Sequence, residues 1–331
     1  MSRYPPDSVD LPPSAFGLSR DELVELLRVR PLRSAARLAV LLAGWVGLGV
    51  ASLHTGSWPL RVLCWLAAGF FVNGVIQLAH ESWHDNLFRR RWQNALFGWC
   101  VGLLAGLAHE PLRHDHLAHH RYNRTERDPD AYNAGRSPAS VVLYYAVVVF
   151  GLPLSILYFN LVYPWQHFPR AALRRHACVL VAMGIFYAAL FVVLRRSGLL
   201  GAAAHLWLLP VLFASPWNGL KSIADHHAND WRGSRFRGAT TARSNAVWTW
   251  LWSGLNYHLD HHLFPRVPGY NLPALHRRIR PVLLERGAPI YDGYLAVMVA
   301  ALRAGPMDIE GKVELTDLRR RPLQRGPGPG R

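Results

Sequence analysis

The sequence contains few cysteines: Cys64, Cys100 and Cys178 are the three thiols among 331 residues. Each lies inside an apolar stretch, and none belongs to a Cys-x-x-Cys pair of the kind found in redox and zinc sites. We therefore interpret them as buried thiols without a structural role and expect no disulfide framework. We also expect no signal peptide, because residues 1–34 are polar and charged and lack an apolar core segment.

Acidic residues are scarce as well. The chain has 21 Asp and Glu against 37 Lys and Arg, a formal net charge of +16, yet 51% of its residues are hydrophobic and 13 are Trp. A membrane protein combines these features naturally, because Arg-rich loops stay on the cytoplasmic side and Trp lines the interfaces. Nucleic-acid binding would also explain the charge. It is disfavoured because the arginines mostly flank apolar segments and form no patch on an amphipathic helix.

Four apolar runs have about the 20 residues that a helix needs to span a bilayer. The runs at 35–53 and 58–79 are joined by a very short turn and predict one hairpin. The runs at 176–194 and 199–215, separated by a turn that begins at Arg195, predict a second.

Two further runs are less regular. The run at 93–108 is short and glycine-rich, which favours a re-entrant or interfacial segment. The run at 140–162 is long enough to cross but is interrupted by Pro153. If the histidine-rich segments share one site, an even number of crossings must separate them. We therefore place 140–162 in the interface.

These runs predict an all-α integral membrane protein, with its membrane domain at 35–300. Four transmembrane helices and interfacial or re-entrant helices would support a cytosolic helical cap carrying a histidine-ligated dimetal site. The positive-inside rule places the active site and both termini on the cytoplasmic side of the inner cell membrane. Residues 1–34 would form a cytosolic segment with a helix capped near Ser19, and the basic, Pro- and Gly-rich tail at 301–331 would be disordered.

Eleven of the 17 histidines fall into four tight groups. The groups are His80 and His84; His114, His116, His119 and His120; His226 and His227; and His258, His261 and His262. Helix positions three or four apart share a face, so the members of His-x-x-x-His and His-x-x-His-His can act together. A structural zinc takes about four ligands, so eight or nine imidazoles indicate two metal ions. Imidazole suits Fe, Zn, Cu and Ni alike, which leaves the metal open.

Acidic side chains stand beside these histidines, where they can accept the second ring N–H of a metal-bound imidazole. The candidates are Glu81, Asp85, Asp115, Asp225 and Asp260. Exposed helix-surface charges are an equally ordinary explanation for any one of them. His114 is out of step with its neighbours, which favours a supporting or substrate-side role. The six isolated histidines are interpreted as packing or interfacial residues.

The pattern resembles the membrane fatty acid desaturase superfamily, whose signature is three histidine boxes. The stretch from Asn256 to His276 is similar to the third box of bacterial acyl-lipid desaturases. His116-Leu-Ala-His-His-Arg-Tyr-Asn, followed by Asp128-Pro-Asp130, resembles the second box, and His80 to His84 the first. Ala224-Asp-His226 resembles the segment that supplies one further ligand, which favours His226 over His227 as a ninth.

The resemblance implies nine metal ligands and a set of supporting residues around them. The ligands would be His80, His84, His116, His119, His120, His226, His258, His261 and His262. Asn256 and His227 would join the acids and His114 as supporting residues. Asp225 and Asp260 stand where Glu is common in the family. The first box is His-x-x-x-His, so regiochemistry cannot be taken from the stearoyl-CoA branch. His258, in place of Gln, argues against a front-end desaturase.

In function, the resemblance implies a di-iron enzyme that uses O₂ to desaturate a fatty-acyl chain linked to a lipid, CoA or a carrier. No His-Pro-Gly-Gly motif occurs, so we expect an external electron donor, ferredoxin or a small b-type cytochrome. Arg113, Arg121, Arg124 and Arg127 could dock that donor or an acyl-carrier headgroup, although solvated arginines explain them equally well.

Two alternatives stay open. One is a hydroxylase or ketolase that acts on a lipid, carotenoid or natural-product chain with the same scaffold. The other is a non-catalytic membrane metal-binding or transport protein. It is disfavoured because transporters place ionisable ligands within their spans, whereas these histidines lie at span ends.

Overall fold

The computed structural model describes residues 12–123, 128–129, 138–226 and 235–304 of the chain. Four sequence predictions concern residues outside these ranges: the tail beyond 304, His227, and the arginines at 124 and 127. The described part is mainly helical. It also contains a two-stranded parallel sheet, β1 (Thr241–Arg243) and β2 (Ile290–Asp292), which the all-α prediction did not include.

Four helical segments are long and apolar enough to cross a membrane, and they confirm the four predicted apolar spans. They are α2 (Pro31–His54), α3 (Trp58–Trp83), α9 (Arg170–Arg196), and the continuous segment of α10 (Leu200–Ala203), a π-helical turn (Ala204–Leu208) and α11 (Leu209–His226). The last helix does not end near residue 215. It continues through Pro216 to His226, so it carries a histidine directly from the apolar segment.

Close backbone contact joins α3 to α11. A side chain on Gly69 of α3 would lie 2.4 Å from the carbonyl oxygen of Phe213, so only glycine allows this approach. Leu41, Trp45, Val72 and other apolar residues fill the space between α2, α3 and α11. This packing fixes the ends of α3 and α11 relative to each other.

The three cysteines are free, but the prediction that all of them are buried was wrong. Cys64 is half-buried, whereas Cys100 and Cys178 are exposed. Helix α9 also exposes Val181, Ile185 and other large apolar residues along its length. A helix that is apolar all round and exposed is typical of a membrane span, since lipid rather than protein covers its outer face. An apolar neighbourhood in the sequence therefore did not indicate burial inside the protein.

The short apolar run near residue 100 forms a bent pair of helices. Helix α4 (Arg91–Ala105) ends at Gly106, which has a left-handed φ of 75°, and α5 (His109–Tyr122) follows at an angle of 111°. The pair counts either as one broken span or as a re-entrant loop. In both cases the bend directs the histidines of α5 back toward α3.

The run at 140–162 is divided into short pieces. Helix α6 (Pro138–Phe150) ends before Gly151, and α7 (Leu152–Leu157), a π-helical turn (Tyr158–Val162) and α8 (Tyr163–His167) follow. None of these pieces is among the candidate spans of the described chain.

A compact group of short elements surrounds the third histidine box. It comprises a 3₁₀ turn (Pro13–Phe16), α1 (Arg20–Leu26), α12 (Ala246–Leu251), α13 (His258–Leu263), a 3₁₀ turn (Gly269–Asn271), α14 (Leu272–Glu285) and α15 (Tyr294–Ala304). Phe16, Leu259 and Ile279 belong to its apolar core. Ser19 caps the start of α1, as the sequence predicted, and forms a reciprocal capping box with Glu22.

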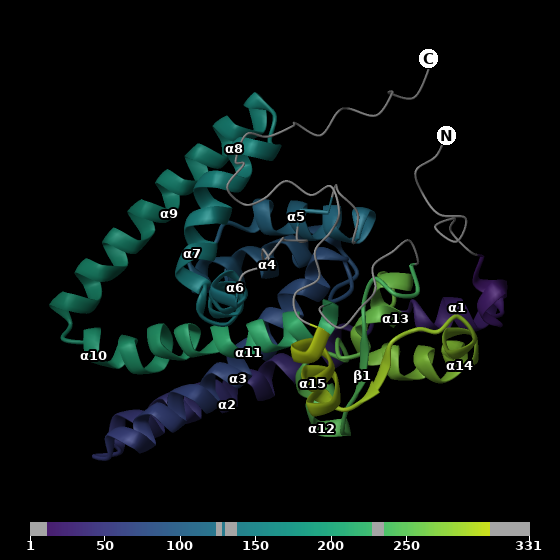
Figure 1. The fold of residues 1–331 in the computed structure, drawn as a ribbon. Helices are drawn as coiled ribbons and strands as arrows, with labels where there is room; N and C mark the ends of the chain where they lie inside the picture. Colours follow the sequence, from purple (N-terminus) through teal and green to yellow (C-terminus); the bar gives the residue numbers. More distant parts are fainter. Residues whose placement is uncertain (1–11, 124–127, 130–137, 227–234, 305–331) are drawn as a thin grey trace.

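Figure 1 shows how these parts are arranged. Helices α2 and α3 run side by side, and the turn that joins them lies near the corner between α9 and α10, at one end of the molecule. The elements α1, α13 and α14 lie together at the other end. The histidine-bearing ends of α3 and α11 therefore lead into the region where the short elements gather.

Candidate metal centre

Nine buried or half-buried histidines come together in two groups whose ring nitrogens lie within 4.8 Å of one another. The first, here called the five-histidine group, contains His80, His84, His116, His120 and His261. The second, the four-histidine group, contains His119, His226, His258 and His262. These are the nine residues that the family resemblance pointed to as ligands. His227 lies outside the described residues.

Helix geometry explains how two helices serve both groups. In α5, His116 and His120 are one turn apart and join the five-histidine group, while His119 faces the other group. Helix α13 does the reverse: His258 and His262 join the four-histidine group, and His261 faces the five-histidine group. The two groups are therefore adjacent, and the rings of His120 and His262 stack at 4.1 Å between centroids.

The distances between ring nitrogens fit ligands of a common ion. Nε2 of His84 lies 2.7 Å from Nε2 of His116. In the other group, Nε2 of His226 lies 3.2 Å from that of His119 and 3.0 Å from that of His258. Two imidazole nitrogens bound at right angles, each about 2.1 Å from an ion, are about 3 Å apart. The spacing therefore suits metal coordination.

Several of these ring nitrogens make no hydrogen bond within the described residues. Both ring nitrogens of His80, His120 and His261 are buried without a hydrogen-bond partner. Burial, reinforced by neighbouring imidazoles, holds the pKa of His120 and His261 well below 6.5. For His84, burial and the nearby Arg113 and Arg266 lower the pKa to about 3. These imidazoles are thus neutral near pH 7, which is the form that binds a metal.

Outer partners orient most of the four-histidine group. Nδ1 of His119 lies 2.9 Å from the Asp128 carboxylate, and Nδ1 of His226 lies 3.0 Å from the carbonyl of Gly238. Nδ1 of His262 lies 3.2 Å from the side-chain nitrogen of Asn123. Such contacts fix the ring so that its other nitrogen faces the metal. Asp128, Gly238 and Asn123 were absent from the predicted supporting residues, although Asp128 belonged to the motif quoted for the resemblance.

Asp225 is a predicted acid that lies beside a clustered imidazole. Its carboxylate is 3.6 Å from Nδ1 of His258 and also accepts a hydrogen bond from the buried ammonium of Lys221. The sequence prediction did not include Lys221. Its only signal was a lysine in the helix that continues a membrane span, a placement that is costly without a partner.

The other predicted acids have different surroundings. Asp260 accepts hydrogen bonds from His276 at 2.9 Å and from Thr241 at 2.6 Å. Glu81 accepts one from the backbone N–H of Gly269 at 2.6 Å. Asp85, at a positive φ of 62°, forms an ion pair with Arg91, and Asp115 is buried in the wall of a cavity.

Asn256 and His114 also have roles outside the two groups. Asn256 exchanges hydrogen bonds with Ala242 of β1, one through its backbone carbonyl and one through its side-chain amide, each at 2.8 Å. This bridge fixes the chain two residues before His258. Nδ1 of His114 lies 2.8 Å from the hydroxyl of Tyr163.

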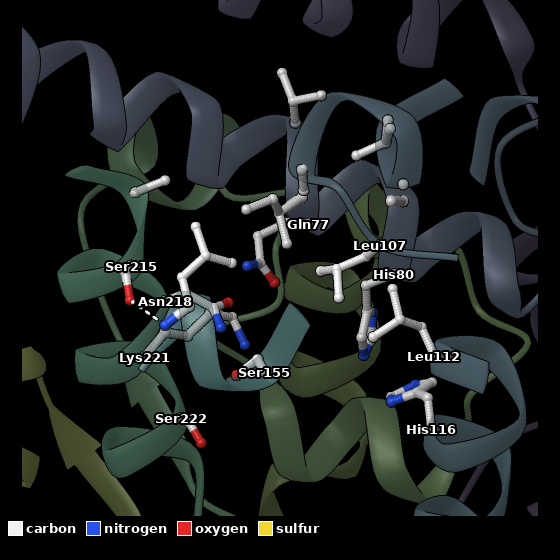
Figure 2. A pocket seen from close by; sticks show the side chains of 18 of the residues that line it. Gln77, His80, Leu107, Leu112, His116, Ser155, Ser215, Asn218, Lys221 and Ser222 are labelled. Atoms are coloured by element: carbon white, nitrogen blue, oxygen red, sulfur yellow. Dashed lines mark hydrogen bonds between the residues drawn. The ribbon is translucent and has the colours of Figure 1, made fainter. Parts of the chain in front are cut away.

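A cavity of roughly 290 Å³ reaches both histidine groups. Apolar residues of α3, α4 and α11, such as Val72, Val101 and Val211, line one part of it. His80 and His116 from one group, and His226 from the other, line another part. Figure 2 shows Leu107 and Leu112 next to His80 and His116. The cavity can therefore bring an apolar chain from the spanning helices to a metal.

Comparison with known proteins agrees with this site. The model of a family described as fatty acid desaturase matches residues 56–294. The chain belongs to the fatty acid desaturase family. It is thus an oxidoreductase, and four apolar helices together with clustered histidines fit a membrane-bound member of this family.

Similar curated proteins include desaturases from distant organisms. The sn-1 oleoyl-lipid 12-desaturase of Picosynechococcus sp. is 25% identical over 277 residues, which cover 76% of this chain and 78% of that protein. The sphingolipid delta(4)-desaturase/C4-monooxygenase DES2 of Bos taurus is 29% identical over 270 residues, covering 75% and 72%. The family is therefore shown, while the substrate is a separate question.

Proposed function

We propose that this chain uses two iron ions and O₂ to desaturate an acyl chain of a membrane lipid. The observation that carries the proposal is the convergence of nine imidazoles at a cavity that begins among the apolar helices. The five-histidine and four-histidine groups would each hold one ion through ring nitrogens.

The donor set suits iron. One group has five imidazoles, the other has four, and neither contains a thiolate. This set matches a metal that binds nitrogen ligands and can take more than four of them. Structural zinc sites are usually tetrahedral, so a five-nitrogen site fits zinc poorly. Bound iron would supply O₂ activation and the abstraction of hydrogen from an unactivated C–H bond.

The protein's own contribution is to position the chain and exclude water. Leu107, Leu112 and Trp83 line the cavity next to the histidines and would hold an acyl carbon there in an apolar environment. The outer hydrogen bonds that His119 and His226 donate to Asp128 and Gly238 would keep these two imidazoles in one orientation during turnover.

The electron donor would approach the surface beside His84. Arg113 and Arg266 are close enough to lower the pKa of that imidazole, so positive charge lies near the five-histidine group. An acidic ferredoxin or small b-type cytochrome fits such a surface. We place this face and the short elements around α13 in the cytoplasm, with the protein in the inner cell membrane, because most arginines flank the spans on that side.

Hydroxylation is the second candidate. It is favoured by one observation: the name of the bovine relative includes both desaturase and monooxygenase. The same hydrogen abstraction can lead to an alkene by loss of a second hydrogen or to an alcohol by gain of oxygen. Identification of the product therefore distinguishes desaturation from hydroxylation.

Expression of the full chain with a ferredoxin and its reductase, followed by mass spectrometry of the host lipids, tests the proposal. We expect a lipid that has lost two hydrogen atoms and a purified chain that carries two iron ions. A product that has gained one oxygen would assign hydroxylation. A purified chain that carries zinc and converts no lipid would contradict both.

A further inference from the structure

A second pocket, lined mainly by arginines, lies outside the metal centre. It has a volume of roughly 430 Å³, and its charged lining consists of Arg28, Asp85, Arg89, Arg91 and Arg266. We call it the arginine pocket. Four guanidinium groups against one carboxylate leave an excess of positive charge in this concave part of the surface.

The four arginines come from three separate parts of the chain. One lies just before α2, two lie at the N-terminus of α4, and one follows α13. The last two parts are in direct contact, because the side-chain amide of Asn86 donates a hydrogen bond to the carbonyl of Pro265 at 2.9 Å. The tertiary structure therefore gathers this charge, and a local run of basic residues does not explain it.

Little of the charge is neutralised by the protein. Arg91 lies 3.6 Å from Asp85, but its side chain is 87% exposed, and an exposed pair of this kind is weak. Within the described residues, Arg89 and Arg266 form no ion pair. Water can hydrate all of these groups, so the pocket needs no ligand for stability. Their summed potential nevertheless attracts an anion, and a guanidinium group binds phosphate through two parallel hydrogen bonds.

Exposed apolar side chains begin directly beside the arginine pocket. Trp92 follows Arg91 in the first turn of α4 and is 59% exposed, and Leu96, one turn further along the same face, is 55% exposed. Leu32, in the first turn of α2, is 85% exposed. Helix α2 is a candidate span, and α4 begins the bent pair. The arginines therefore lie where apolar segments start, which is the level of the lipid phosphates in a bilayer.

We propose that the arginine pocket binds the phosphate group of an anionic phospholipid, whose acyl chains lie along Leu32, Trp92 and Leu96. An acidic protein would match the charge but would leave these apolar side chains uncovered, so their position favours a lipid. The lipid would connect the loop after the first histidine box with the loop after the third. It is not the substrate, because the arginine pocket and the cavity at the histidines share no lining residue in the described part of the chain.

Native mass spectrometry of the purified full chain in mild detergent tests the proposal. The probes are phosphatidylglycerol and phosphatidylcholine with the same two acyl chains, so they differ only in the headgroup. We expect phosphatidylglycerol to bind at least about tenfold more tightly, because its net negative charge is held by several arginines, whereas choline adds a cation among them. An excess of inorganic phosphate should displace little of the bound lipid, since it lacks the acyl chains.

Two double variants separate the arginine pocket from the general positive charge of this face. Arg28→Gln with Arg89→Gln should lower the affinity for phosphatidylglycerol about tenfold and change that for phosphatidylcholine less than twofold. Arg174→Gln with Arg175→Gln removes two exposed arginines near the start of another span, α9, and should retain the preference. Arg266 is left intact, because it also belongs to the surface proposed for the electron donor.

Four results would overturn the proposal. Equal affinity of the wild type for the two lipids would show that the arginine pocket does not select charge. Equal losses in the two double variants would assign the preference to the charge of the whole face. Full displacement by inorganic phosphate would assign the pocket to a free anion. Displacement by an acidic ferredoxin, abolished by Arg28→Gln with Arg89→Gln, would assign it to the electron donor. Failure of the proposed function is distinct, because these binding measurements require no conversion of lipid.

Discussion

The two histidine groups differ in how their rings are supported. In the four-histidine group, a carboxylate, a carbonyl and an amide lie at hydrogen-bond distance from the outer nitrogens of His119, His226 and His262. In the five-histidine group, His80, His120 and His261 have no hydrogen-bond partner on either nitrogen within the described chain. One group is thus oriented from outside, while the other is held by packing.

This difference has a chemical meaning. Outer hydrogen bonds fix a ligand and make it more basic, whereas a ring held only by packing can rotate as its metal changes coordination. We therefore expect the four-histidine group to hold its ion more tightly. The five-histidine group has the extra ligand and lies beside Arg113 and Arg266, near the expected entry of electrons.

Removal of one ligand from each group gives the largest expected effect. His261→Ala and His226→Ala should each lower lipid conversion more than about 100-fold, beyond the usual cost of losing an outer partner. His261→Ala should lose only the ion of the five-histidine group, since the other group keeps its oriented rings. Iron per chain, measured by elemental analysis, would then fall by half.

His54→Ala is the matched control, because His54 lies at the end of α2 and belongs to neither group. It should retain both ions and full activity. Loss of both ions from His261→Ala would show that the groups are not independent sites and would remove the basis of the comparison.

The buried pair behind His258 gives the next largest effect. Lys221→Ala should lower the free energy of unfolding by about 3–5 kcal/mol, because it leaves the Asp225 charge buried without its ammonium partner. Thermal unfolding in detergent would measure the loss. The double variant Lys221→Met, Asp225→Asn should recover most of it, since no uncompensated charge is left. A double variant as unstable as Lys221→Ala would contradict this explanation.

Much of this site could be predicted from the local spacing of histidines in the sequence. Positions three and four apart share a helix face, so the histidine boxes could be recognised without a fold. The same rule explains why Asp260 turns elsewhere: it lies two positions from His258, on a different face of α13, and bonds with His276 instead. Sequence adjacency to a histidine was therefore a poor guide to supporting acids.

The rest depends on tertiary structure. Which member of each His-x-x-His-His joins which group is set by how α5 and α13 face each other, and no local pattern encodes that. Asp128 comes nine residues after His119 and beyond the end of α5, so no helical spacing connects them. Asp85, next to His84, has a positive φ and pairs with Arg91. Only the folded structure shows that Asp128 supports a histidine and that Asp85 does not.

Asp128 offers a smaller and more selective perturbation. Asp128→Asn should weaken the ion of the four-histidine group about 10- to 100-fold, the usual cost of losing an outer carboxylate, and leave the other ion in place. Titration of the purified chain with a chelator, followed by elemental analysis, would show one ion leaving early. Asp85→Asn, which alters a half-buried carboxylate that pairs with Arg91, should leave both ions as in the wild type. If Asp128→Asn releases both ions equally, outer support does not distinguish the groups.

The smallest effect concerns single imidazoles in the iron-free chain. Burial, with neighbouring imidazoles, holds the pKa of His120 and of His262 well below 6.5 in the folded state. The unfolded chain takes up protons as the pH falls below about 6.5 and the folded chain does not, so stability must decrease with acidification below that value. Each such group adds up to about 1.4 kcal/mol per pH unit to the slope.

His120→Gln and His262→Gln should therefore each flatten the dependence of unfolding free energy on pH by up to that amount. His120 belongs to the five-histidine group and His262 to the four-histidine group. If both variants flatten the slope equally, burial sets the pKa of the imidazoles in both groups, and the two groups differ only when metal is bound. A slope unchanged in both variants would mean that these imidazoles titrate alike in the folded and unfolded chain.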